Sequence, residues 1–375
     1  MNPLATLHIV RRYGPVGGME RYVWELTGAL AAAGHPVTVV CERNSGGPQS
    51  GVIVHELGEI ARRPRWLSLL RFSRRVARWL REHPQPGTLI HSHERVYVHH
   101  VTTFHGPPFA TVFERGWWRR VSLRVWMQLY LERRELCAPG VRAVVPNSHL
   151  IKQQLQHYYP QLGPRLTAPI PPGATPGPAR EPRAVPAAAG VIGFVGKEWQ
   201  RKGLARAVAI VAELRRHRPQ LELWVIGPAP AEIAALFADW DGGFRLIGWA
   251  NDFAVYAQLD LLLHPARAEP YGMVIAEAMT AAVPVVVSDR CGIAPDIGAE
   301  SGEVLALDAP DAAWIAACER QLSRTDAPPR FARNWQQVAR EYEVLYRELT
   351  VAPQEVTPGG SGIRDRSQPV KGLRR

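Results

Sequence analysis

Two glutamates with a glycine between them form the pattern in this chain best suited to chemistry. Glu269 falls in an expected loop, and Glu277, separated from it by seven residues, falls about one turn inside an apolar helix predicted for Met273–Ala282. At this spacing they cannot be an acid/base pair on one helical face. Gly272 allows close backbone approach, and free N–H groups from Gly272 to Val274 suit a pyrophosphate. The carboxylates can then accept ribose and sugar hydroxyls; an ordinary solvated loop is the alternative.

These residues must be positioned by a strand, loop, helix, strand unit. The apolar runs Leu261–Leu263 and Val283–Val287 predict the two strands on either side of the helix. Such a βαβ unit turns the loop and the helix start toward the carboxyl edge of a parallel sheet.

A second loop carries three cations. Val191–Val195 predicts a strand, and Lys197, Arg201 and Lys202 follow it before a helix that extends to Arg218. No Ser or Thr follows Lys197 where a Walker loop needs one. Fixed cations and helix N–H groups can stabilise the charge of a departing diphosphate without a metal. A solvated turn is the alternative.

The first half of the chain opens with a similar arrangement. Leu7–Val10 and Val37–Cys41 predict strands on either side of a helix over Met19–Ala33, which a loop containing Gly17 and Gly18 precedes. The opening is Rossmann-like without the G-x-G-x-x-G spacing, so a dinucleotide site is disfavoured. The glycines either face a ligand or serve chain geometry alone.

Polar residues follow two further strands of the first half. His93 and Glu94 come after Thr88–His91, and His105 comes directly after Val101–Phe104. Residues at such strand ends lie at the ligand-binding edge of a parallel sheet. A histidine there takes part in catalysis or is a structural hydrogen-bonding group.

The chain divides at a segment rich in Pro, Ala and Gly, which cannot form a strand or a long helix. The predicted organisation is a domain at 1–168, a linker at 169–190, a domain at 191–330, a helix at 331–350 and a disordered tail at 351–375.

Composition excludes several classes of protein. The 46% hydrophobic and 21% charged residues are typical of a soluble globular protein, and we expect it in the cytoplasm because no transmembrane run or secretion signal is present. The four cysteines lack CxxC spacing and a nearby His cluster, which argues against zinc and disulfides and favours reduced core residues.

The positive charge lies in the first half. Residues 1–175 carry 22 Lys and Arg against 10 Glu and no Asp, and the rest carries 23 against 24 acidic residues. Such a half can attract nucleic acid, anionic lipid or a phosphorylated acceptor, and the absence of a nucleic-acid motif disfavours the first. Amphipathic stretches at 61–83 and 116–135 either pack on the sheet or meet an anionic membrane.

The segment EPYGMVIAEAM at 269–279 resembles the E-x7-E signature of retaining GT-B glycosyltransferases, and of family 4 in particular. The V-x-N-S segment at 145–148 fits this family, and VVSDRCGIA at 286–294 is similar to bacterial lipopolysaccharide core glucosyltransferases. The resemblance implies an α/β fold of the GT-B type. Two Rossmann-like domains would face across a cleft, and the C-terminal helix would cross back to the first domain.

The resemblance also implies roles for individual residues. His105 would lie beside the anomeric carbon, Glu269 would hold the transferred sugar and Lys202 the diphosphate, and these three form the implied catalytic group. His93 and Glu94 would contact the acceptor. The implied donor-binding set is Gly17, Gly18, Lys197, Arg201, Lys202, Ile247 (at the base), Glu269, Tyr271, Gly272, Met273, Val274 and Glu277 (at the ribose).

The activity that the resemblance implies is retaining transfer of a hexose from a nucleotide diphosphate-sugar, UDP-glucose being the first expectation. The acceptor would be a saccharide or lipid-linked acceptor of lipopolysaccharide core or other cell-envelope polysaccharide synthesis. We expect no cofactor and no metal, because no DxD pair follows a strand, and a monomer that binds no nucleic acid and is peripheral on the inner membrane face. The alternatives are a non-catalytic sugar-nucleotide-binding protein and a membrane-surface interaction protein.

Overall fold

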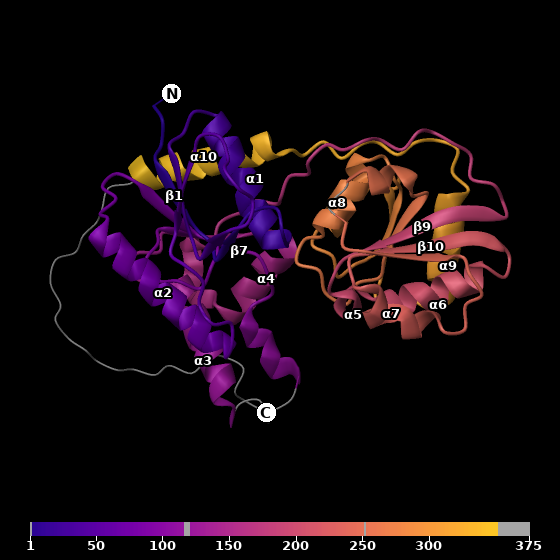
Figure 1. The fold of residues 1–375 in the computed structure, drawn as a ribbon, viewed down its shortest axis with the longest axis horizontal. Helices are drawn as coiled ribbons and strands as arrows, with labels where there is room; N and C mark the ends of the chain where they lie inside the picture. The colour runs from indigo at the N-terminus through magenta and orange to yellow at the C-terminus, as the bar shows by residue number, and fades with distance from the viewer. Residues whose placement is uncertain (1, 116–120, 251–252, 352–375) are drawn as a thin grey trace. The chain divides into compact units, whose positions relative to one another are not determined.

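The computed structural model describes residues 2–115, 121–250 and 253–351. The chain forms two compact units: unit 1 is Met1–Ile170 with Gln336–Arg375, and unit 2 is Pro171–Trp335. Each unit contains one six-stranded sheet with all neighbouring strands parallel and helices on both faces (Figure 1). Within the described ranges, every helix is too short or too polar to cross a membrane.

The sheet of unit 1 has the strand order β5-β3-β1-β6-β7-β8, and a two-stranded pair, β2-β4, lies beside it. The strands are β1 (Thr6–Ile9), β2 (Arg12–Tyr13), β3 (Val37–Cys41), β4 (Arg43–Asn44), β5 (Val52–Glu56), β6 (Leu89–Ser92), β7 (Val101–Phe104) and β8 (Ala143–Pro146). The helices are α1 (Gly18–Ala32), α2 (Arg65–Glu82), α3 (Leu123–Cys137), α4 (His149–Tyr158) and α10 (Trp335–Val351).

The two faces of this sheet are covered by different helices. Leu7 and Ile9 of β1 pack in one core with Phe72 of α2, whereas Val39 of β3 packs in a separate core with Val23 of α1. The apolar sides of α1 and α2 are buried in this way, and each buried aliphatic side chain stabilises the unit by roughly 1.5–3 kcal/mol. For α2 this leaves most of its arginines in water, as one of the two sequence interpretations expected.

Helix α10 packs on unit 1 through tyrosine hydroxyls. The Tyr342 hydroxyl lies 2.8 Å from that of Tyr22 and 2.6 Å from Thr103 Oγ1, and the Tyr346 hydroxyl lies 2.6 Å from His91 Nδ1. Helix α10, the last helix within the described residues, therefore completes the polar core of the first unit.

The helix predicted for 331–350 begins instead at Trp335. Arg330 Nε donates to the Thr280 carbonyl at 2.7 Å, and Arg333 Nε donates to the Pro171 carbonyl at 3.0 Å. These bonds hold residues 330–334 in unit 2 in a conformation that is not helical.

The sheet of unit 2 has the order β11-β10-β9-β12-β13-β14. Its strands are β9 (Ala189–Val195), β10 (Gln220–Ile226), β11 (Phe244–Gly248), β12 (Leu261–His264), β13 (Val285–Ser288) and β14 (Gly302–Leu305). Its α-helices are α5 (Trp199–Lys202), α6 (Leu204–Leu214), α7 (Pro230–Ile233), α8 (Met273–Thr280) and α9 (Asp311–Leu322), and short 3₁₀ segments include η4 (Ala234–Phe237) and η5 (Phe253–Gln258).

Strand β12 is buried on both faces, which explains its continuous apolar sequence. Leu261 and Leu263 pack in one core with α6 and α9, and Leu262 packs in the other with Ile275 of α8. The two cores fix β12 and α8, which flank the loop that carries Glu269, and α8 itself carries Glu277.

Several elements differ from the predicted bounds. Helix α2 begins at Arg65 rather than Ala61, because a residue before a proline, here Arg63, avoids helical dihedral angles. The stretch predicted from 116 gives α3 only from Leu123, and 116–120 lie outside the described residues. The helix predicted to end at Arg218 is two helices, α5 and α6, because Gly203 has a left-handed conformation with φ 85°.

Two further predictions are corrected or refined. The segment expected as a linker has no helix or strand over 171–188, yet Arg180 and Arg183 each pair with Asp260 at 2.9 Å and attach it to unit 2. All four cysteines are free, but Cys137 is half-exposed rather than a core residue.

Candidate functional site

The carboxyl edge of the unit 2 sheet carries a compact cluster of charged side chains around Glu269. Glu269 Oε2 lies 3.3 Å from Lys202 Nζ and 3.5 Å from both Arg201 Nη1 and His264 Nε2. Lys202 and Glu269 are buried, and His264 at the end of β12 is fully enclosed. The structure thus brings together the two residues expected at the transferred sugar and the diphosphate, along with Arg201.

Electrostatics keep Glu269 ionised. Burial raises the pKa of Glu269, but Lys202, His264 and Arg201 outweigh burial and hold the pKa below its ordinary value. Burial lowers the pKa of His264, so its imidazole is neutral at pH 7. Among the described residues no group reaches Glu269 Oε2 with hydrogen-bond geometry. A buried carboxylate oxygen held this way is free to accept a bond from a ligand hydroxyl.

Glycines bring the backbone close to the cations. Lys202 ends α5, and its side chain lies over Gly196, where a Cβ would come 2.4 Å from Lys202 Cδ. Gly227 approaches the backbone of Gly196 in the same way, with a would-be Cβ 2.7 Å from its carbonyl carbon. Both glycines have positive φ, at 142° and 124°, so neither position suits another residue.

Lys197 does not join the Glu269 cluster. Its ammonium lies 3.7 Å from the centroid of the exposed Trp249 ring, just after β11. Ile247, expected at the base, is exposed on β11 two residues before Trp249. The cation–π contact places Lys197 beside the expected base region, and sequence reasoning had not singled out Trp249.

The start of α8 forms the second part of this site. Gly272 is the N-cap with φ 112°, and the N–H groups of Met273 and Val274 have no acceptor within the helix, whereas those of Ile275 and Ala276 donate to the Gly272 carbonyl. Glu277, one turn on, accepts a 2.6 Å hydrogen bond from the hydroxyl of Tyr256. Tyr271 is buried in the core of the unit, so its ring lies away from this surface.

In unit 1, the half-buried His105 and the buried His93 belong to a line of imidazoles. His93 Nδ1 lies 3.0 Å from His105 Nε2, and His93 Nε2 lies 3.2 Å from His8 Nδ1. The His105 ring also meets the edge of Tyr22 at 4.8 Å between centroids. Burial lowers the pKa of His8 and His105 to about 3, and burial followed by the neighbouring histidines lowers that of His93, so the line is neutral at pH 7.

The sequence did not reveal that His91 joins His8 and His93 in a group with the spacing of metal ligands. His91 already bonds the Tyr346 hydroxyl and Thr103 Oγ1, at 2.6 and 2.8 Å. These hydrogen bonds account for the arrangement of the rings.

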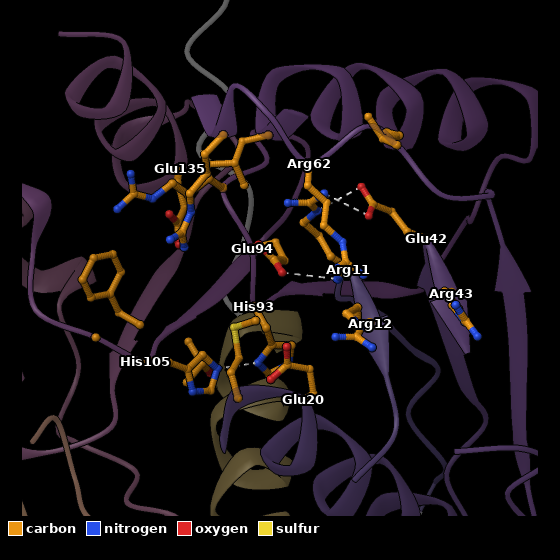
Figure 2. Close-up of a pocket in the computed structure, with 18 of the residues that line it drawn as sticks. Arg11, Arg12, Glu20, Glu42, Arg43, Arg62, His93, Glu94, His105 and Glu135 are labelled. Atoms are coloured by element: carbon orange, nitrogen blue, oxygen red, sulfur yellow. Dashed lines mark hydrogen bonds and ion pairs between the residues drawn. The ribbon is translucent and has the colours of Figure 1, made fainter. Parts of the chain in front are cut away.

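His93, Glu94 and His105 line a cavity of about 590 Å³ in unit 1 (Figure 2). Burial raises the pKa of Glu94 to about 7 although Arg11 opposes it, and Glu94 Oε1 accepts a 3.3 Å bond from the Arg11 amide. Gly17 and Gly18 lie at the start of α1 in this unit, with Gly17 as the extended N-cap.

Sequence reasoning therefore missed His264, Tyr256 and Trp249. His264 had one usable signal, because it is a polar residue at the end of an apolar strand. No pattern in the sequence points to Tyr256 or Trp249, because each contacts its partner only in the folded chain.

Two family models match successive parts of the chain. Residues 16–177 match Glycosyltransferase Family 4, and residues 189–324 match Glycosyl transferases group 1. The lipopolysaccharide glucosyltransferase WaaG of Escherichia coli (strain K12) is 32% identical over 177 residues, which are 45% of this chain and 46% of that protein. The chain spans about half the length of the curated relatives it matches.

Solved structures agree on the fold. The crystal structure of WaaG, a glycosyltransferase involved in lipopolysaccharide biosynthesis, has a TM-score of 0.75 at 23% identity and covers 90% of this chain and 94% of that one. Anabaena HepE in complex with UDP-glucose has a TM-score of 0.66 at 16% identity, covering 92% of this chain and 100% of that one. With both family models and two parallel α/β units, the chain belongs to the group 1 glycosyltransferases of family 4, which have the GT-B fold.

Proposed function

We propose that this protein transfers a hexose, with retention of configuration, from a nucleotide diphosphate-sugar to a saccharide or lipid-linked acceptor. UDP-glucose is the first donor to test. The observation that carries the proposal is the buried carboxylate of Glu269 beside Lys202 and Arg201, at the edge where α8 presents its free N–H groups. WaaG and the UDP-glucose complex of HepE support a glucose donor and a role in lipopolysaccharide core or other cell-envelope polysaccharide synthesis.

The reaction is written as a front-face displacement. The bond between the anomeric carbon and the diphosphate oxygen breaks, and the acceptor oxygen bonds to that carbon on the same face. The acceptor proton passes to the departing diphosphate. Lys202, Arg201 and the α8 amides stabilise the charge that develops on the diphosphate, so the residues present supply what a metal supplies elsewhere. Glu269 orients the sugar, and Glu277 binds the ribose.

A thermal-shift panel of nucleotide sugars tests donor binding, because a bound ligand raises the melting temperature by mass action. We expect UDP-glucose to give the largest shift, and radiolabelled glucose to pass to an acceptor fraction without added metal. A shift without transfer to any acceptor would favour a non-catalytic binding protein. Association with anionic vesicles without any nucleotide shift would favour a membrane-surface protein.

Glu277 gives a prediction about donor affinity. Replacing it with glutamine removes charge-assisted hydrogen bonds to the ribose, so KM for the donor rises about 10-fold to 100-fold while kcat falls less. Tyr256→Phe is the control, because it removes only the hydroxyl that bonds Glu277 at 2.6 Å and keeps the carboxylate. Steady-state kinetics with varied UDP-glucose measure both. An unchanged KM in Glu277→Gln contradicts the ribose role.

The neutral histidines give a prediction about pH. Burial lowers the pKa of His105 to about 3, and burial followed by the neighbouring histidines lowers that of His93 well below its ordinary value, so neither is expected to titrate near pH 6.5. The pH profile of kcat/KM is therefore expected to lack an acid limb near 6.5, the ordinary histidine value. A limb near 6.5 that His105→Asn abolishes would show that His105 titrates normally and acts as a charged group.

A further inference from the structure

The cavity of unit 1 is lined by more arginines than its glutamates neutralise. Seven arginines and five glutamates face it, and His93 and His105 lie side by side at one end (Figure 2). In the same view Arg62 lies beyond Glu94 and Arg11, on the side away from the histidines. Arg62 and the two imidazoles therefore lie toward opposite ends of this cavity.

Three of the arginines are already paired. Arg11 makes a two-bond pair with Glu42, at 2.9 Å and 3.0 Å, and Arg43 Nη1 lies 3.0 Å from Glu59. Arg95 Nη2 lies 2.8 Å from a third glutamate, Glu132. These three arginines build the wall of the cavity and add little net charge to it.

The other four arginines have no such partner. Throughout the part of the chain that the structure describes, no ion pair or hydrogen bond engages the side chains of Arg12, Arg62, Arg63 and Arg65. All four are exposed, so each guanidinium can turn into the cavity without breaking an existing contact. Arginine suits a phosphate there because its planar donors bind two oxygens at once.

The remaining glutamates do not cancel this charge. Burial raises the pKa of Glu94 to about 7 and that of Glu135 to about 8, in both cases against the nearby Arg11 or Arg95. Half or more of each is protonated at pH 7, which leaves Glu20 as the main unpaired anion. Four arginines against one glutamate give the cavity a surplus of about three positive charges.

Without a bound anion, the position of three of these arginines at the start of α2 is electrostatically unfavourable. Arg62 and Arg63 precede α2, Arg65 is its first residue, and the first turn of α2 contains no acidic residue. The N-terminal end of a helix carries a partial positive charge, so cations there are unfavourable by roughly 0.3–1 kcal/mol each. A bound anion would remove this penalty and also accept from the free N–H groups of the helix.

We propose that this cavity binds an anionic group of the acceptor, a phosphate or diphosphate ester, through Arg12, Arg62, Arg63 and Arg65. The hydroxyl that receives the sugar then lies at the other end, beside His105. The inference rests on the proposed function, and it names the class of acceptor: a saccharide or lipid-linked sugar that carries phosphate. Distance within the cavity would separate the anchoring group from the reacting hydroxyl.

The test compares two triple variants of one helix region. Arg62→Ala/Arg63→Ala/Arg65→Ala removes three cavity arginines, and Arg71→Ala/Arg74→Ala/Arg78→Ala removes the same charge from exposed positions of α2 that do not line the cavity. The probe is glycerol 3-phosphate, titrated calorimetrically at low salt into the full chain with UDP present in excess to occupy the donor site. Thermal melting confirms that both variants are folded.

We expect the wild-type protein and the exposed-face triple to bind glycerol 3-phosphate with affinities within about 3-fold, and the cavity triple to lose at least about 30-fold. Equal weakening in both triples, or no binding to the wild-type protein, overturns the proposal. So does a cavity triple that keeps its affinity for glycerol 3-phosphate but loses binding to phosphatidylglycerol vesicles, because these arginines would then serve a lipid surface.

Donor titrations separate this proposal from the proposed function. UDP-glucose affinity should be the same in all three proteins, because Lys202 and Glu269 lie in unit 2 and neither triple changes Gly17 or Gly18. A protein that binds glycerol 3-phosphate as expected but ignores UDP and UDP-glucose contradicts the donor proposal and leaves the anion site standing. A protein that binds UDP-glucose but no phosphate ester contradicts the anion site and leaves the donor proposal standing.

Discussion

Replacing Lys202 with methionine will lower kcat for sugar transfer by about 10³-fold. Methionine keeps the apolar stem that covers Gly196 and removes only the ammonium, which lies 3.3 Å from Glu269 Oε2. The loss is large because a fixed charge is worth most where negative charge develops on the leaving diphosphate in an enclosed site. Transfer of radiolabelled glucose at saturating donor measures it.

Lys202→Met could also lower kcat in a second way, which must be distinguished from the first. Lys202 also holds the Glu269 carboxylate, so its removal could act by misplacing Glu269 alone, although Arg201 and His264 remain 3.5 Å away. The double variant Lys202→Met/Glu269→Gln distinguishes the two. If Lys202 stabilises the diphosphate, the lysine substitution still costs about 10²-fold or more in the Glu269→Gln background.

The control for charge is Arg216→Ala, which removes an exposed cation from the same unit, paired only across its own helix end with Glu213. Its kcat should stay within about 2-fold of the wild-type value. A Lys202→Met enzyme whose kcat also stays within about 10-fold would remove Lys202 from the catalytic group.

The local elements of this site could be predicted from the sequence, but the contacts between its side chains could not. The run Leu261–Leu263, the glycine at 272 and the helix after it are contiguous, and short-range patterns predict them well. His264, by contrast, reaches Glu269 only because the loop folds back to let Glu269 pair with Cys291 in a short parallel bridge. No periodic pattern in the sequence predicts that the loop folds back in this way.

The edge strand β5 and the contacts between residues far apart in the chain were also not predicted from the sequence. Strand β5 (Val52–Glu56) was not predicted, because an edge strand exposed to solvent lacks the apolar run that a central parallel strand shows. His8 and His93 are 85 residues apart and meet only because β1 and β6 are neighbours in the sheet. The arginine cavity likewise joins residue 12 of one strand pair to the start of α2.

Gly203 shows how tightly the fold and the donor site are coupled, and it gives the largest expected effect on stability. It ends α5 and begins α6 with φ 85°, and a Cβ there would come 2.2 Å from the Pro265 carbonyl oxygen. That carbonyl is backbone in the loop between β12 and Glu269, whose Arg267 amide also donates to the Arg201 carbonyl at 2.9 Å. The glycine thus lets the Lys202 loop lie directly against the Glu269 loop.

Gly203→Ala is expected to destabilise unit 2 by about 2–5 kcal/mol, adding about 1–2 for the left-handed conformation to about 1–3 for displacing backbone. For a unit of this size the melting temperature falls by roughly 10 °C. Because the two loops move apart, the thermal shift with UDP-glucose should also be lost. Calorimetry of the full chain with and without the donor measures both effects.

Gly242→Ala is the matched control for this prediction. Gly242 lies in the same unit with φ 74°, but a Cβ there meets nothing within 4 Å, so only the conformational cost of about 1–2 kcal/mol applies. Its melting temperature should fall by only about 2–8 °C, and its response to UDP-glucose should be kept. Equal losses in the two variants would mean that the approach to Pro265 is not what makes Gly203 necessary, and that the two loops position Lys202 and Glu269 independently.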